Sequence, residues 1–118
     1  MEFKIEIEIT LTEEDIDKIM KVALEEGIGY WCQRAEVAGG KYLGEYASDQ
    51  ISRGGSLLLT CDQGEKELNS QNFLNGVKRA IMEGSISIEN CEIDSDDIDC
   101  FAADQIIQYA LFGDLIYA

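Results

Sequence analysis

The sequence predicts a single α+β domain in which a small, mostly antiparallel sheet packs against about three helices. Its 118 residues match the length of one domain that can bury a core without disulfides. Segments with the two-residue period of strands and segments with the period of helices occur in turn along the chain. No repeat and no linker interrupts them, so we expect residues 1–118 to form one domain.

The first predicted element is a half-buried edge strand over residues 2–9. Apolar and charged residues alternate strictly here, which is the pattern of a strand with one face on a core. The apolar set is Phe3, Ile5, Ile7 and Ile9, and the charged set is Glu2, Lys4, Glu6 and Glu8.

The second predicted element is a helix that begins after Thr12 and ends near Gly27. Thr12 suits the N-cap, Asp15 stands at the position of a capping box, and Leu11 can pack against Ile16. Glycine is the usual residue just after a helix end, which fits Gly27.

The middle of the chain predicts loops followed by a hairpin. Residues 38–55 contain five glycines and indicate irregular turns. A central strand over 57–61, a tight turn over 62–64 and a short strand over 65–68 follow.

The C-terminal part predicts two further helices. One spans about 70–83 and ends at Gly84, and the other spans Ser95 to Phe112 and ends at Gly113. Ile86 and Ile88 between them indicate a short strand, and residues 115–117 are expected to pack back on the core.

The net charge of −15 limits the classes of partner. Twenty-four acids against nine bases repel nucleic acids and anionic membranes and favour basic proteins or cations. Acidity that serves only solubility is the alternative. The first residues lack a signal-peptide pattern, so the cytoplasm of a host bacterial cell is the expected compartment, with reduced cysteines.

Sequence motifs favour binding over catalysis. The chain has no histidine, which removes the commonest general base and the serine–histidine and cysteine–histidine pairs. The glycines near Lys41 lack the spacing of a phosphate-binding loop. We therefore expect no enzymatic activity.

A metal site is one interpretation of the segment between Cys91 and Cys100. A hard cation could use Asp94, Asp96 and Asp99, although the spacing is not that of a calcium-binding loop. Zinc could recruit Cys91 or Cys100 with an aspartate, so the candidate ligands are Cys91, Asp94, Asp96 and Cys100. Alternatively, Asp94 or Ser95 caps the third helix and the cysteines fill the core.

The other candidate site is a partner-binding surface in the C-terminal third, where no basic residue follows Arg79. Carboxylates on a folded scaffold could imitate the phosphates of a duplex, or they could simply be solvated. The candidate residues are Glu83, Glu89, Glu92, Asp94, Asp96, Asp97, Asp99 and Asp104. Four aromatic residues, Tyr30, Trp31, Tyr42 and Tyr46, could be core anchors or interface hot spots.

Three segments carry a resemblance: Tyr30–Cys32 (YWC), Tyr42–Gly55 (YLGEYASDQISRGG) and Asp104–Gly113 (DQIIQYALFG). With the opening strand and helix they cover most of the chain, which resembles small acidic proteins of phages and conjugative elements of Gram-positive bacteria. Some proteins of this kind are anti-CRISPR inhibitors of type II effectors. The resemblance implies a DNA mimic that binds a Cas9-type nuclease, and it assigns no functional residue. The alternative is a metal-binding or regulatory interaction module of a mobile element without inhibitor activity.

Overall fold

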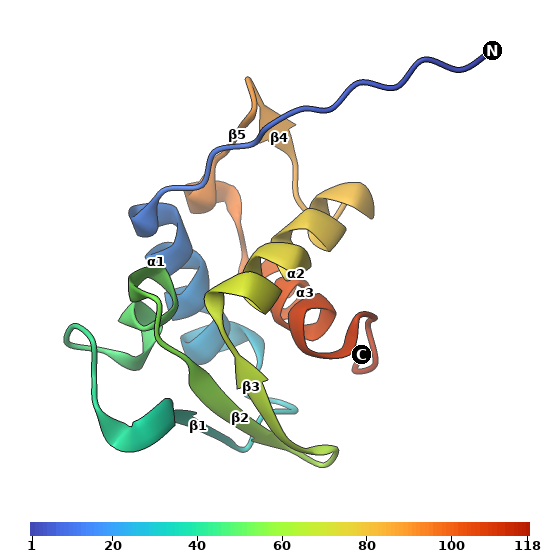
Figure 1. The fold of residues 1–118 in the computed structure, drawn as a ribbon. Helices are drawn as coiled ribbons and strands as arrows, with labels where there is room; N and C mark the ends of the chain where they lie inside the picture. The colour runs from blue at the N-terminus through green and yellow to red at the C-terminus, as the bar shows by residue number, and fades with distance from the viewer.

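Figure 1 shows the computed structural model, which describes residues 1–118 as an α+β fold, as the sequence predicts. Three α-helices and a three-stranded sheet form the body, and a two-stranded hairpin lies at the end away from the larger sheet. The helices are α1 (Glu13–Val22), α2 (Ser70–Met82) and α3 (Cys100–Phe112). The strands are β1 (Arg34–Val37), β2 (Leu57–Cys61), β3 (Gly64–Leu68), β4 (Ile88–Glu89) and β5 (Glu92–Ile93).

The larger sheet is antiparallel, with β2 between β1 and β3. Leu57, Leu59 and Cys61 of β2 point to the buried face, as the alternation of a strand requires. Cys61 pairs with Gly64 across a two-residue turn, so the predicted central strand and hairpin are confirmed. Strand β1 was not predicted, because only one of its four side chains, Val37, is buried.

The first helix begins as predicted. The Thr12 hydroxyl accepts a hydrogen bond from the Asp15 amide at 3.1 Å, and the Thr12 amide donates to the Asp15 carboxylate at 3.0 Å. A single π-helical turn, Ala23–Gly27, extends α1 to the predicted glycine.

Helices α2 and α3 form the closest pair in the core. A β-carbon placed on Gly76 of α2 would lie 2.3 Å from the carbonyl oxygen of Ile106, so glycine lets the two backbones approach. Phe73, Ile106 and Ile107 are fully buried at this contact. Residues 38–55 form irregular and 3₁₀ turns, as the glycines predict. No helix is long and apolar enough to cross a membrane.

The predicted N-terminal strand does not form within the chain. Residues 1–9 run outward past the β4–β5 hairpin (Figure 1), and only Thr10 pairs, in parallel with Glu92. The side chains of Phe3, Ile5 and Ile7 are 85%, 86% and 64% exposed. The alternation therefore describes an amphipathic extended segment with no partner strand in its own fold.

The third helix begins at Cys100 rather than Ser95. Residues Ser95–Asp97 form a separate 3₁₀ turn, Ile98 is extended, and Asp99 caps α3. Burial of Ile98 in the core requires this break, since the extended residue turns the side chain inward. Of residues 115–117, which were predicted to pack back on the core, Tyr117 does so, with its ring stacked on Trp31 at a centroid distance of 5.0 Å, while Leu115 and Ile116 are exposed.

Candidate functional site

Five exposed carboxylates gather at the end of the molecule that carries the β4–β5 hairpin. We call Glu89, Glu92, Asp94, Asp97 and Asp99 the acidic surface. None of the five forms an ion pair with a lysine or arginine. Four of them, all except Glu92, line an open hollow of about 400 Å³ whose apolar lining includes Ile86, Ile88 and Ile98.

Backbone contacts fix two of these carboxylates in place. Asp94 accepts a hydrogen bond from the Asp96 amide at 3.0 Å, and Asp99 accepts one from the Ala102 amide at 2.9 Å. Aspartate commonly satisfies backbone amides at turns and helix starts in this way. Each carboxylate keeps a second oxygen free, so the two caps also present negative charge to solvent.

The hairpin brings two like charges directly opposite each other. Glu89 pairs with Glu92 across the two-residue turn Asn90–Cys91, both of whose φ angles are positive. Like charges at opposed positions of a sheet disfavour pairing. A cation from another molecule would relieve this repulsion, which favours this end of the protein as a binding surface.

Two of the predicted partner-binding acids are already neutralised within the chain. Asp96 forms an ion pair with Lys18 at 2.9 Å, and Glu83 forms one with Arg79 at 3.4 Å. The hydrogen bond and charge of Asp96 raise the pKa of Lys18. Asp96 and Glu83 therefore contribute less to the field of the surface than the five unpaired acids.

Asp104 was predicted to belong to the partner-binding surface, but it lies in the core. Its side chain is only 8% exposed and accepts hydrogen bonds from Trp31 Nε1 at 2.7 Å, the Tyr30 hydroxyl at 2.6 Å and Gln108 Nε2 at 3.0 Å. Burial and the bond to Asp104 raise the pKa of Tyr30 to about 12. The indole N–H of Trp31 needs an acceptor once buried, and Asp104 supplies it.

The structure does not gather the predicted metal ligands. Cys91 lies exposed in the hairpin turn, and Cys100 is the half-buried first residue of α3. No three cysteine, aspartate or glutamate side chains of the chain are arranged to hold a metal ion. Asp94 and Asp96 are instead engaged by the backbone and by Lys18, respectively.

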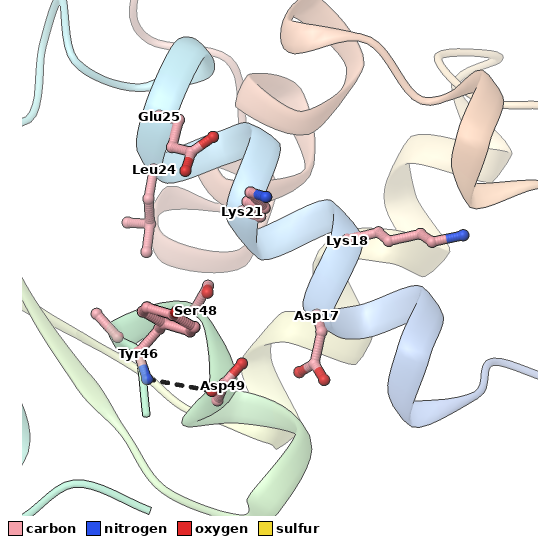
Figure 2. Close-up of a pocket in the computed structure, with 9 residues that line it drawn as sticks. Asp17, Lys18, Lys21, Leu24, Glu25, Tyr46, Ser48 and Asp49 are labelled. Carbon is pink, nitrogen blue, oxygen red and sulfur yellow. Dashed lines mark hydrogen bonds between the residues drawn. The ribbon is translucent and has the colours of Figure 1, made fainter. Parts of the chain in front are cut away.

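A second hollow, of about 570 Å³, lies elsewhere and was not anticipated from the sequence. It lies between the first helical segment and the turn around Tyr46, and in Figure 2 the side chains of Asp17 in α1 and Leu24 in the following π-helical turn point toward that turn. Its two aspartates already have partners in the chain. Asp17 accepts from the Ser52 hydroxyl at 2.6 Å, and Asp49 accepts from the amides of Glu45 and Tyr46, each at 3.1 Å.

Asp49 therefore holds the turn in shape, and Asp17 connects α1 to Ser52. Comparison with protein-family models, with curated proteins and with solved structures finds no match to this chain. Function therefore has to be inferred from the acidic surface itself.

Proposed function

We propose that this protein is a non-catalytic inhibitor whose acidic surface binds the basic, nucleic-acid-binding face of another protein and blocks nucleic-acid loading. The observation that carries the proposal is the gathering of five exposed, unpaired carboxylates at one end of the fold, four of which line one hollow. The net charge of −15 adds a long-range attraction for a basic partner.

The chemistry of the surface suits an imitation of nucleic acid. A duplex presents closely spaced negative charges, and proteins meet them with lysine and arginine side chains. Carboxylates accept the paired N–H donors of arginine in a similar geometry. Asp94 and Asp99 are held by backbone amides, so less conformational entropy is lost when they bind.

The partner we propose is a Cas9-type nuclease, as the resemblance to small acidic proteins of phages and conjugative elements implies. Such a nuclease reads a short duplex motif with arginines and holds nucleic acid in a basic channel. An acidic protein seated on either surface would exclude target DNA. This assigns the chain an anti-CRISPR activity in the host bacterial cell.

The proposal is tested by comparing two variants with the same change in charge. In the surface variant, Glu89→Gln, Glu92→Gln, Asp94→Asn, Asp97→Asn and Asp99→Asn are combined. In the control variant, Glu25, Glu26, Glu45, Glu65 and Glu67, which are all exposed, are changed to glutamine. Each variant removes five negative charges, so a difference between them reports position rather than total charge.

We expect guide-loaded nuclease to bind the control variant nearly as well as the unchanged protein. Binding of the surface variant should weaken by about tenfold or more, and added salt should weaken all the complexes through screening. Equal loss in both variants would contradict the proposal, because net charge alone would then explain binding.

A further inference from the structure

The N-terminal segment, residues 1–9, is the one extended part of the chain whose backbone is left without hydrogen bonds. None of its amide or carbonyl groups bonds within the chain, and the first paired residue is Thr10, whose amide donates to the Cys91 carbonyl at 3.1 Å. Exposed strand backbone of this kind is a template for pairing with another chain. In Figure 1 the segment extends well beyond the body of the protein.

The protein's own fold cannot supply the missing strand. Thr10 lies parallel to Glu92, so continued pairing toward the N-terminus would require strand residues just before Glu92. Those residues are Asn90 and Cys91, which form the hairpin turn with φ angles of 53° and 60°. Residues 1–8 therefore run past the end of the only strand beside them.

An apolar groove lies at the base of the segment. Eight of its nine lining residues are hydrophobic, and its volume is about 400 Å³. Leu74 and Met82 of α2 line it and are 46% and 68% exposed, while Ile7 and Ile9 line it from the segment. The apolar face of the segment and the groove thus form one continuous exposed hydrophobic surface, which is typical of an interaction site.

We propose that this surface binds a second copy of the chain, through antiparallel pairing of the two N-terminal segments about a twofold axis at Ile5. This register pairs the whole of residues 1–9, since each position i faces position 10 − i of the second copy. It sets Ile5 against Ile5 and Phe3 against Ile7, so the apolar side chains share one face. Phe3 of the second copy then lies beside Ile7, at the groove.

Charge complementarity in the segment supports this occupant. The same register sets Lys4 opposite Glu6 on the charged face, twice in the symmetric pair. The like-charged pair Glu2 and Glu8 falls at the outer ends, where water screens it best. A shift of one residue would place charged side chains on the apolar face and is excluded.

The overall charge makes this association distinguishable from the proposed inhibitor binding. Two copies each carry a net charge of −15 and repel, so added salt should strengthen the pairing of copies. The same salt should weaken attachment to a basic partner. The two interactions use different residues, so failure of one leaves the other standing.

The experiment is sedimentation equilibrium of the full chain over a range of concentrations at low and high salt. We expect a monomer–dimer equilibrium that shifts toward dimer at high salt. Ile5→Asp should weaken the dimer by about a hundredfold or more, because it places two carboxylates at the centre of the apolar face. The matched control, Ile116→Asp, changes a residue that is 44% exposed at the other end of the chain and should leave the dimer intact.

Charge exchange tests the register. Lys4→Glu alone and Glu6→Lys alone should each weaken self-association by about tenfold, since each creates like-charged pairs. The double variant, and an equimolar mixture of the two single variants, should restore association. Hydrogen exchange should show protected amides in residues 2–8 only under conditions where the dimer is present.

A protein that stays monomeric at every concentration overturns the proposal. Protection of residues 2–8 in that monomer would assign the segment to its own chain, and protection only after a basic partner is added would assign it to that partner. A dimer that survives Ile5→Asp also overturns the proposal, because another surface must then hold it.

Discussion

At the scale of single residues, Asp104 joins parts of the chain that are far apart in sequence. Its buried carboxylate accepts hydrogen bonds from the Trp31 indole, the Tyr30 hydroxyl and the Gln108 side-chain amide. These bonds connect the segment after α1 to α3. The side-chain oxygen of Gln108 in turn accepts hydrogen bonds from the backbone amides of Ile116 and Tyr117, each at 2.9 Å. These bonds hold the C-terminal residues against Trp31. The segments Tyr30–Cys32 and Asp104–Gly113, which carry part of the family resemblance, therefore meet in one hydrogen-bond network with a structural role.

Replacement of Asp104 should destabilise the fold strongly. Asp104→Ala leaves the buried Trp31 N–H without an acceptor and removes three hydrogen bonds, so we expect the free energy of unfolding to fall by about 2–4 kcal/mol. Asp97→Ala, at an exposed residue with no ion-pair partner, should change it by less than about 0.5 kcal/mol. Urea unfolding followed by far-UV circular dichroism measures both, and equal effects would show that Asp104 is not a structural residue.

The Tyr30 hydroxyl gives a pH-dependent signature of the same network. Its pKa of about 12 lies above the ordinary value of 10, because burial and the bond to Asp104 both disfavour the phenolate. A raised pKa means that the folded state holds the proton more tightly than the unfolded state. The stabilisation is therefore complete below about pH 10 and is lost as the pH rises toward 12.

An ultraviolet titration of the phenols tests this expectation. The difference between the unchanged protein and Tyr30→Phe isolates Tyr30 from Tyr117, whose pKa is also raised through its hydrogen bond to Asp62. We expect this difference to show a transition near pH 12, and Asp104→Ala should move the transition toward 10. A Tyr30 transition at 10 in the unchanged protein would contradict the network.

At the scale of elements, the sequence predicted correctly those features that depend on interactions between residues close together in the chain. The capping box of Thr12 and Asp15, the central strand β2 and the turn before β3 depend on neighbouring residues, and the structure confirms all three. The start of α3 depends instead on how Ile98 packs, so the sequence predicted Asp94 or Ser95 as the cap, whereas the structure uses Asp99. The alternation of apolar and charged residues over 2–9 indicates a strand with one apolar face, but it does not show whether the partner strand belongs to the same chain or to another.

The contact between α2 and α3 gives a prediction at this scale. Gly76→Ala should destabilise the protein by about 1–3 kcal/mol although alanine favours helices, because its β-carbon would overlap the Ile106 carbonyl and lie 2.9 Å from Ala110 Cβ. Gly29→Ala is the matched control, since nothing lies within 4 Å of its added carbon. Comparable unfolding midpoints for the two variants would show that the helices can separate without cost.

At the scale of the whole molecule, only three ion pairs form, so most of the 24 carboxylates have no lysine or arginine partner. Ion pairs neutralise Glu36, Glu83 and Asp96, while the five carboxylates of the acidic surface stay unpaired at the end opposite the three-stranded sheet (Figure 1). The sequence predicted the acidic third of the chain from the absence of bases after Arg79. It could not separate the exposed acids from Asp104, because only the tertiary contact with Trp31 buries that residue.

Competition between this protein and target DNA for a guide-loaded Cas9-type nuclease tests the central claim most directly. We predict that the apparent dissociation constant of the protein rises in proportion to the concentration of target duplex, as expected when both ligands use one basic site. The surface variant should compete at least about tenfold more weakly than the control variant with the same charge. Binding that target DNA does not affect, or equal competition by the two variants, would contradict the claim that the acidic surface replaces nucleic acid.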